Sequence, residues 1–295
     1  MKKKISVIGG DMRQIYLSNI MSQKNEIYIY GNEHDHLGSS VHIASSLEEA
    51  VKDACFIICP IPFSKDNKHI YAINTKEKIL YKNLFNLITT KQSILSGPYK
   101  SEVLRLAKEN NIHLIDIVAS DEFAILNSIP TAEGVISMMI ENVGITLANH
   151  KCLVLGYGRC GMAITDLVKK LNMDVSVASV YDEELMMATI KNCKTIKIQD
   201  NKLVKINYLT LNNIQDYNTI TLEEFNYVIN TIPVALIDIE LTKKLDDYIF
   251  IDIANVYKDN KNKFINARGV PGKYSPKTAA KIISGVIEKE LRKYA

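Results

Sequence analysis

Residues 151–161 read KCLVLGYGRCG, an apolar run that ends in the spacing Gly-x-Gly-x-x-Gly, and a helical pattern follows from 162 to 171. A strand, a tight glycine turn and a helix start in this order are typical of a site for a dinucleotide pyrophosphate. Gly156 permits the turn, Gly158 lets the backbone approach the phosphates, and Gly161 lets the helix pack closely on the strand. The first helical N–H groups and the positive end of the helix dipole then attract the anion. The alternative is a glycine turn that only packs a helix on a strand.

The residues after this turn continue the pattern of a Rossmann dinucleotide-binding domain, predicted to span 151–273. A second strand covers 174–179, a helix starts at Asp182, and no element is predicted in the lysine- and asparagine-rich region 191–213. Two further strands, 227–230 and 248–251, end in polar residues that are expected on the nicotinamide side of the cofactor. The predicted cofactor-binding residues are Gly156, Tyr157, Gly158, Arg159, Cys160, Gly161, Ser179, Val180, Tyr181, Thr231, Ile232, Pro233 and Asp252.

The end of the second strand bears on the choice of dinucleotide. An NAD site normally has Asp or Glu there, hydrogen-bonded to the ribose hydroxyls. Here the strand ends in Ser179, Val180 and Tyr181, and Asp182 is expected to cap the next helix instead. A small hydroxylic residue leaves room for a 2′-phosphate, although the arginine that usually neutralises this phosphate is absent. We therefore expect NADP as the cofactor, with NAD as the alternative.

Length and composition allow two packed domains, since the chain has 295 residues of which 47% are hydrophobic. The net charge of +3 is too small to indicate a nucleic-acid partner. No apolar stretch reaches the ~18 residues of a membrane span, so a cytosolic protein is expected. The odd count of 5 cysteines argues against a disulfide framework. Cys55 and Cys59 flank a predicted buried strand, so no metal site is expected there.

Residues 1–127 alternate strand-like and helical segments, which is the pattern of an open parallel sheet covered by helices on both faces. The predicted fold class is α/β, with two doubly wound parallel-sheet domains: a flavodoxin-like N-terminal domain for substrate or partner, and the Rossmann domain. The last helix, within 274–295, has apolar residues at helical spacing and is expected to pack back onto the first domain. Strands of the first domain are expected at 5–8, 27–30, 55–59, 93–95 and 113–118, and helices at 11–21, 47–52 and 100–110.

Two loops follow strands of this first sheet. The first contains Gly9, Gly10, Asp11 and Arg13, without a third glycine at dinucleotide spacing. Arg13 is suited to hold a carboxylate in a forked geometry, and the alternative is a salt bridge to Asp11 or a neighbour. The second loop, 60–68, has the length of a lid or a partner contact, with a plain surface loop as the alternative.

An apolar helix is predicted from Val135 to Leu147, within a segment, 128–150, that links the two domains. Pro130 fits the first turn, where its missing N–H costs nothing, and Ser128 is expected to cap the helix. The residues expected to line the cleft between the domains are Asn127, Thr131 and Glu133.

These motifs together resemble the dipicolinate synthase family of spore-forming bacteria, and within it the A subunits, over essentially the whole chain. The resemblance implies oxidation of dihydrodipicolinate to dipicolinate with NADP, together with a B subunit, in the mother-cell cytoplasm during sporulation. The sequence departs from the family at Val180, where an arginine is usual, which puts the NADP preference in doubt. The motifs that carry the resemblance are Gly9-Gly10-Asp11-x-Arg13, Asn127-Ser128-Ile129-Pro130-Thr131-Ala132-Glu133-Gly134, residues 155–161, Asn230-Thr231-Ile232-Pro233 and Gly269-Val270-Pro271-Gly272-Lys273-x-x-Pro276-Lys277-Thr278-Ala279.

A dicarboxylate substrate requires cations, and its oxidation removes a hydride from one ring carbon and a proton from another position. Because aromatisation drives the step, the protein mainly holds the ring against the nicotinamide and takes one proton. The expected substrate-binding residues are Asp11, Arg13, Thr131, Lys273 and Lys277. The catalytic candidates are Asp121, Glu133, Asp252 and Lys277. For each of the three acids, a helix cap or a structural hydrogen bond is an equally good interpretation.

Two other functions remain open. One is a non-catalytic dinucleotide-binding subunit that presents substrate or senses redox state for a partner. The other is a 2-hydroxy-acid dehydrogenase, which needs a histidine–carboxylate pair in the cleft. The 6 histidines include none in a late loop of the cofactor domain, which argues against this enzyme class. A homo-oligomer is compatible with every one of these functions.

Overall fold

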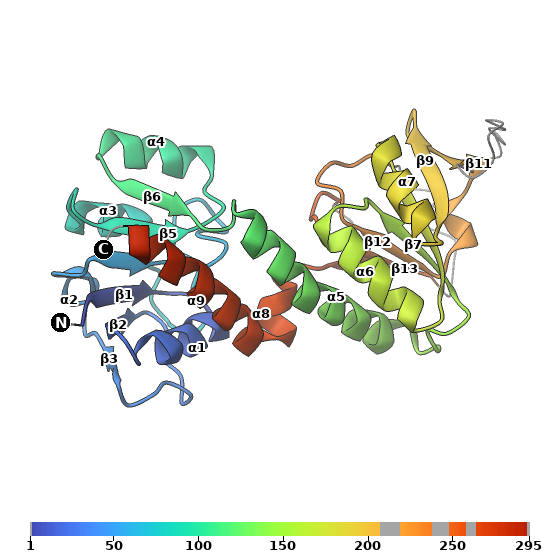
Figure 1. The fold of residues 1–295 in the computed structure, drawn as a ribbon. Coiled ribbons are helices and arrows are strands. Elements are labelled where there is room, and N and C mark those ends of the chain that lie inside the picture. Colours follow the sequence, from blue (N-terminus) through green and yellow to red (C-terminus); the bar gives the residue numbers. More distant parts are fainter. Residues whose placement is uncertain (1, 207–218, 238–247, 258–263, 294–295) are drawn as a thin grey trace. The chain divides into compact units, whose positions relative to one another are not determined.

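The computed structural model describes residues 2–206, 219–237, 248–257 and 264–293 (Figure 1). The chain forms two compact units. Unit 1 consists of Met1–Asn127 together with Ser275–Ala295, and unit 2 consists of Ser128–Tyr274. Each unit contains one sheet of mostly parallel strands with helices between the strands, which confirms the predicted α/β class.

The sheet of unit 1 has parallel strands in the order β3-β2-β1-β4-β5-β6. Without the short edge strand β3, the other strands follow the flavodoxin order. The sequence did not predict β3, because its three residues present only one buried side chain, Val41. The strands are β1 (Lys4–Ile8), β2 (Glu26–Tyr30), β3 (Val41–Ile43), β4 (Phe56–Ile58), β5 (Ser93–Ser96) and β6 (His113–Asp116).

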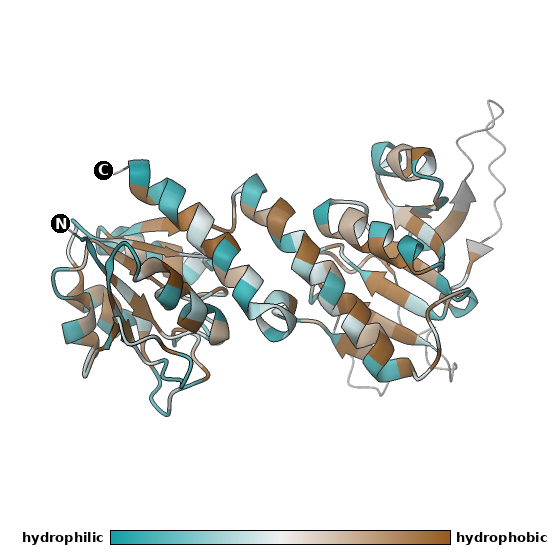
Figure 2. Ribbon diagram, turned by 60° about the horizontal axis from the view of Figure 1, so that its bottom comes forward, coloured by the Kyte–Doolittle hydropathy of each residue, from teal (hydrophilic) through white to brown (hydrophobic). Residues whose placement is uncertain are grey.

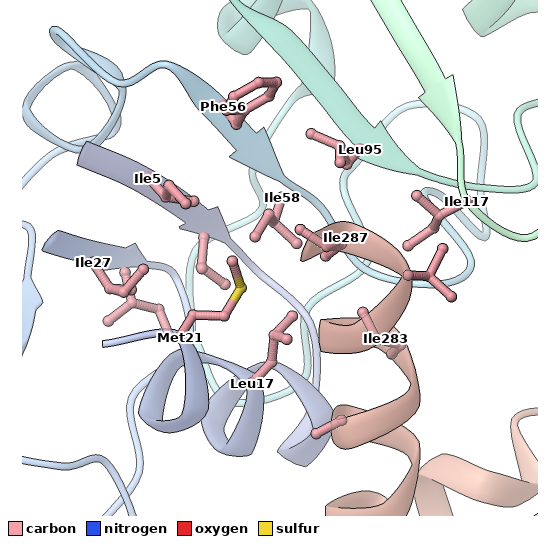
Figure 3. Close-up of a cluster of buried hydrophobic side chains, with 14 of the residues drawn as sticks. Ile5, Leu17, Met21, Ile27, Phe56, Ile58, Leu95, Ile117, Ile283 and Ile287 are labelled. Carbon is pink, nitrogen blue, oxygen red and sulfur yellow. The ribbon is translucent and has the colours of Figure 1, made fainter. Parts of the chain in front are cut away.

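Helices cover both faces of this sheet. One face carries α1 (Met12–Met21) and α9 (Pro276–Lys293), and Figure 3 shows Ile283 and Ile287 of α9 in the same cluster as Leu17 of α1. Helix α9 begins at Pro276 rather than at Ala279, the start that the sequence predicts, because proline is well suited to the first helical position. The other face carries α2 (Leu47–Val51), α3 (Tyr81–Leu87) and α4 (Ser101–Glu109).

The sheet of unit 2 has the order β11-β10-β9-β8-β7-β12-β13-β14. From β9 to β14 the strands are parallel in the Rossmann order, and β10 and β11 extend one edge antiparallel. The sequence did not predict the β9–β10 hairpin; its turn residues Asp200 and Asn201 have φ of 50° and 59°, which suits a two-residue hairpin. The strands are β7 (Lys151–Leu155), β8 (Asp174–Ser179), β9 (Lys194–Gln199), β10 (Lys202–Ile206), β11 (Thr219–Ile220), β12 (Tyr227–Asn230), β13 (Ile249–Asp252) and β14 (Phe264–Asn266).

The central strands β7, β12 and β13 of unit 2 are buried on both faces, and Figure 2 shows the strands mostly brown, whereas the helices mix brown with teal. One apolar cluster joins the strands to α5 (Asp121–Val143), α6 (Arg159–Lys170) and α8 (Val270–Tyr274). A second cluster includes Leu222 of the short 3-10 helix η1 (Leu222–Glu224). Helix α7 (Asp182–Ile190) packs Leu185 and Ala188 into a third.

Helix α5 corrects two predictions. It starts at Asp121, not at Val135, and Pro130 lies inside it. The backbone N–H of Phe123 donates to Oγ of Ser120 at 3.1 Å, so Ser120 rather than Ser128 caps the helix. The sequence misled because an interior proline removes a helical hydrogen bond and usually marks a helix boundary.

Helix α5 is also long and apolar enough, by length and composition, to span a membrane. Half of the relevant window, 50%, is buried inside the protein. Ala132, Val135 and Met139 of this helix belong to the core of unit 2. Packing within the unit therefore accounts for these three residues, whereas Ile129 and Ile140 of the same helix are exposed.

Candidate functional site

A glycine turn joins β7 to α6 in unit 2 (Figure 1). Gly156 has a φ of 90°, in the left-handed region that favours glycine. A Cβ atom at Gly156 would lie 2.6 Å from Oγ1 of Thr231. A Cβ atom at Gly161 would collide with the carbonyl oxygen of Gly156. Both positions therefore require glycine for close packing of the helix, the turn and β12.

Gly158 differs from these two glycines. It is the N-cap residue of α6, and no described protein atom lies within 4 Å of a Cβ atom built on it. No side chain of the described residues caps the helix there. The N–H groups in the first turn of this 12-residue helix therefore lie beside the open space at Gly158 without a capping side chain. An open approach to backbone donors at a helix N-terminus suits a pyrophosphate. The residues of the turn thus fit a dinucleotide.

A carboxylate from α7 reaches the end of β8, and the sequence did not reveal this contact. Oγ of Ser179 donates a hydrogen bond of 2.6 Å to Oε2 of Glu184, a residue in the first turn of α7. The same Oε2 accepts the backbone N–H of Tyr157 from the glycine turn at 3.0 Å. The N–H of Tyr181 donates to Oγ of Ser179 at 3.1 Å. The sequence signal that could have pointed to Glu184 is the group of acids in the first turn of α7. By itself, this pattern indicates only the start of a helix.

Two side chains of the turn face the protein core or its edge. The ring of Tyr157 is buried against Val177 and Leu185, and this burial raises the pKa of its hydroxyl to about 12. Burial likewise raises the pKa of the Cys160 thiol above its usual range. Neither group is therefore suited to proton transfer or nucleophilic attack near neutral pH. Tyr157 contributes to the turn through its backbone.

The end of β12 lies beside the glycine turn. Thr231 donates to the carbonyl oxygen of Leu155 twice, from its backbone N at 3.0 Å and from Oγ1 at 2.8 Å. The N–H of Ile232 donates to Oδ1 of Asn230 at 3.1 Å, and Pro233 is exposed. These bonds fix the carboxyl ends of β7 and β12 next to each other, where the sequence predicts cofactor contacts.

Asp252 is fully buried at the end of β13, with 0% exposure. Its Oδ1 accepts hydrogen bonds from Nδ2 of Asn230 at 2.9 Å and from the N–H of Asn255 at 3.0 Å. Its Oδ2 accepts the N–H groups of Val256 at 2.8 Å and Tyr257 at 2.9 Å. A carboxylate with both oxygens occupied and no exposure has no access to a substrate proton. We therefore assign Asp252 a structural role rather than that of the base.

In unit 1, Arg13 is buried, with 6% exposure, and pairs with Asp11. Its Nε and Nη2 donate to the two carboxylate oxygens at 2.9 and 2.8 Å, and Nη2 also donates to the carbonyl oxygen of Ile61 at 2.5 Å. Asp11 caps α1 as well. The structure thus shows the salt bridge that the sequence left as one of two interpretations, and it ties the 60–68 loop to α1.

The loop 60–68 is anchored at several points. Phe63 is buried in the core, and the Asp66 carboxylate accepts Nδ1 of His69 at 2.6 Å. Hydrogen bonds from the His69 ring, and from the N–H groups of His69 and Lys68, hold the pKa of Asp66 below its usual range. These contacts favour a fixed structural loop over a lid.

The remaining predicted substrate residues lie in different places. Lys277 is exposed at the start of α9, and Nζ lies 5.4 Å from the ring centroid of Tyr16. Lys273 in unit 2 donates to the hydroxyl of Tyr274 at 2.8 Å, and this bond raises the pKa of the lysine. Thr131 is buried, with 4% exposure.

The two other acids considered as bases are both exposed on α5. Asp121 lies in the first turn of the helix, within unit 1, and Glu133 lies within unit 2. No hydrogen bond or ion pair joins the Glu133 carboxylate to another residue in the described part of the chain. The Glu133 carboxylate is therefore accessible from solvent. Among the residues that the structure describes, no group of three His, Cys, Asp or Glu side chains is arranged to hold a metal ion.

Comparisons with known proteins agree with this architecture. Residues 4–118 match the family described as the N-terminal domain of the dipicolinate synthase A subunit. The chain is 25% identical over 300 residues to the dipicolinate synthase A subunit of Bacillus subtilis (strain 168), covering 98% of this chain and 95% of that protein.

Two crystal structures share the fold. The dipicolinate synthase A subunit from Bacillus halodurans has a TM-score of 0.82 at 24% identity, with 98% of this chain and 97% of that chain covered. The corresponding dipicolinate synthase chain from Bacillus subtilis has a TM-score of 0.77 at 24% identity, with 99% and 97% covered. Residues 4–118 thus match the family of N-terminal domains of dipicolinate synthase A subunits, and the chain is similar to such a subunit over essentially its whole length.

Proposed function

We propose that the chain is the A subunit of a dipicolinate synthase, a nicotinamide-dependent oxidoreductase that converts dihydrodipicolinate to dipicolinate together with a B subunit. The observation that carries the proposal is the open approach to Gly158 at the start of α6, in a sheet of Rossmann order. The similarity to the Bacillus subtilis A subunit supports the substrate and the need for a second subunit. We place the activity in the cytoplasm of the mother cell of a sporulating bacterium.

The reaction removes two hydrogens from a CH–CH bond of the ring. A nicotinamide dinucleotide held at this site would supply the hydride acceptor. The backbone donors at the start of α6 would hold its pyrophosphate, and the ends of β8 and β12 would position the rest of it. The lack of a carboxylate in the β8 sequence itself favours NADP, whereas Glu184 brings a carboxylate to that strand end in the folded chain.

The second hydrogen leaves as a proton, for which Glu133 is the proposed acceptor. Its carboxylate is exposed and has no partner among the described residues, whereas the Asp252 carboxylate is buried and fully bonded. Lys277 is the proposed anchor for a substrate carboxylate, because its ammonium is exposed at a helix start. Arg13, bound to Asp11 and Ile61, positions α1 and the 60–68 loop. Of its guanidinium nitrogens, Nη1 alone makes no hydrogen bond to the described residues.

The direct test mixes the purified chain with oxidised cofactor and dihydrodipicolinate, with and without the B subunit, and follows absorbance at the reduced-nicotinamide band. An increase that depends on both substrate and this chain is expected. Binding of the dinucleotide without any reduction, even with the B subunit present, would instead identify a dinucleotide-binding subunit without catalytic activity. A chain that binds neither nicotinamide dinucleotide would refute the proposed function.

A further inference from the structure

Glu184 connects the carboxyl ends of two neighbouring strands. Its Oε2 accepts the N–H of Tyr157 after β7 at 3.0 Å and Oγ of Ser179, the last residue of β8, at 2.6 Å. The two strands pair in parallel, with Leu155 opposite Ala178. In dinucleotide-binding domains, an acid near the end of the second strand binds the adenosine ribose. Glu184 brings a carboxylate to this place from the following helix.

The carboxylate of Glu184 is held by one of its two oxygens. Both hydrogen bonds use Oε2, and Oε1 accepts none from the residues that the structure describes. Two donors on one oxygen fix the orientation of the group before a ligand arrives. The second oxygen remains available as an acceptor, and an ionised carboxylate accepts hydrogen bonds but cannot donate them. Ribose hydroxyls are donors of the kind that this oxygen requires.

The charges around this position are mostly negative, although Lys197 on β9 pairs with Ser179 at the end of β8. The first turn of α7 contains Asp182, Glu183 and Glu184, which occupy the positive end of its helix dipole. Nζ of Lys197 lies 2.5 Å from Oδ1 of Asp182, so the charge of this lysine is already offset. Val180, next to the strand end, has no side-chain donor. A 2′-phosphate, which carries roughly −1.5 to −2 at neutral pH, would face these carboxylates.

We propose that Glu184 determines the cofactor specificity of this chain. Its carboxylate accepts hydrogen bonds from the 2′- and 3′-hydroxyls of the adenosine ribose and repels a 2′-phosphate, so that NAD(H) binds more tightly than NADP(H). The proposal rests on the proposed dinucleotide function and deepens it. It reverses the NADP preference that the sequence of β8 alone indicates, because the acid that distinguishes the two dinucleotides, Glu184, belongs to α7.

The test titrates the full chain with NADH and, separately, with NADPH, and follows nicotinamide fluorescence without any substrate. NADH is expected to bind at least about ten-fold more tightly, which corresponds to one charge-assisted hydrogen bond. Glu184→Gln removes the charge while keeping the size of the side chain. This variant is expected to weaken NADH and strengthen NADPH, reducing the ratio of their dissociation constants by about ten-fold.

Glu183→Gln is the matched control, since Glu183 is an exposed acid in the same helical turn and the substitution changes the charge equally. It is expected to leave the ratio within about two-fold, because among the described residues no hydrogen bond joins its side chain to the glycine turn or to the end of β8. Thermal unfolding of each variant shows whether it is folded, and the ratio for the unmodified chain does not depend on any variant.

Tighter NADPH than NADH binding by the unmodified chain would overturn the assignment of Glu184. Equal shifts of the ratio of dissociation constants in Glu184→Gln and Glu183→Gln would also overturn it, since the effect would then come from any loss of negative charge in this turn. Absence of binding by both dinucleotides would refute the proposed function itself, and the assignment with it.

Discussion

Nζ of Lys277 lies 5.4 Å from the centroid of the Tyr16 ring, so the start of α9 meets α1 within unit 1. A cation over an aromatic face is held by the ring quadrupole while its donors remain in solvent. Arg13 lies one helical turn before Tyr16 on α1. Lys277 and Thr278 in the first turn of α9 are both exposed, so a cation and the start of a helix are accessible to a carboxylate.

Replacing Lys277 with Met is expected to weaken dipicolinate binding by about ten- to a hundred-fold, the loss of one hydrogen bond to a charged group. Calorimetric titration with dipicolinate measures the change. Lys281→Met, a change of an exposed lysine one turn further along α9, is the control and should have little effect. NADH affinity should remain unchanged, because the glycine turn belongs to unit 2. Normal dipicolinate binding by Lys277→Met would rule out this anchor.

The buried carboxylate of Asp252 leads to a prediction about stability. Asp252→Asn replaces an acceptor by an amide nitrogen, which would then face a donor at Asn255, Val256 or Tyr257. The free energy of unfolding should fall by about 1.5–3 kcal/mol, because a buried donor loses a charged partner. Urea unfolding measures it, with Glu133→Gln as the exposed control that should leave stability unchanged. An Asp252→Asn chain of full stability that has lost turnover would identify a catalytic role instead.

The glycine turn could be predicted because its signal is local. The apolar run of β7, the left-handed Gly156 and the start of α6 all follow from adjacent residues. The β9–β10 hairpin escaped prediction because the lysines of each strand lie three residues apart, at 194 and 197 and at 202 and 205, which breaks the two-residue alternation typical of a strand. Its turn was encoded by Asp200 and Asn201, a pair that tolerates positive φ.

The chemistry of single residues depended on contacts that no local pattern contains. Asp252 was correctly placed at a strand end, but the backbone N–H groups that surround it come from the following loop. Glu184 reaches back from a helix to the end of the preceding strand, so a rule about residues at strand ends passes over it. Pro130 had the opposite effect, because a strong local signal for a helix start was overridden by the continuous packing of α5.

Because the space at Gly158 is open, a larger residue there should weaken cofactor binding without impairing folding. Gly158→Val places its Cβ where no described protein atom lies within 4 Å, so the fold should be retained. NADH binding should weaken more than about ten-fold, because the branched side chain blocks backbone donors of the pyrophosphate site. Gly161→Ala is the contrasting variant, since its methyl would collide with the carbonyl of Gly156 and lower the thermal midpoint. A folded Gly158→Val protein with unchanged NADH affinity would contradict a pyrophosphate site at this turn.

The Arg13–Asp11 ion pair predicts that Arg13 contributes mainly to the stability of the fold. Both side chains are almost entirely buried, and Arg13→Met would leave the Asp11 carboxylate without its partner. Breaking a buried ion pair in this way costs about 3–5 kcal/mol, measurable as a lower midpoint in urea unfolding. Adding Asp11→Asn removes the unpaired charge and keeps an oxygen that accepts the backbone N–H of residue 13 at the helix start, so the double variant should recover part of the loss. Dipicolinate affinity of the folded fraction should change less than in Lys277→Met, because the guanidinium is already bound to Asp11 and Ile61. A stable Arg13→Met protein that binds dipicolinate poorly would show instead that Arg13 contacts the substrate directly.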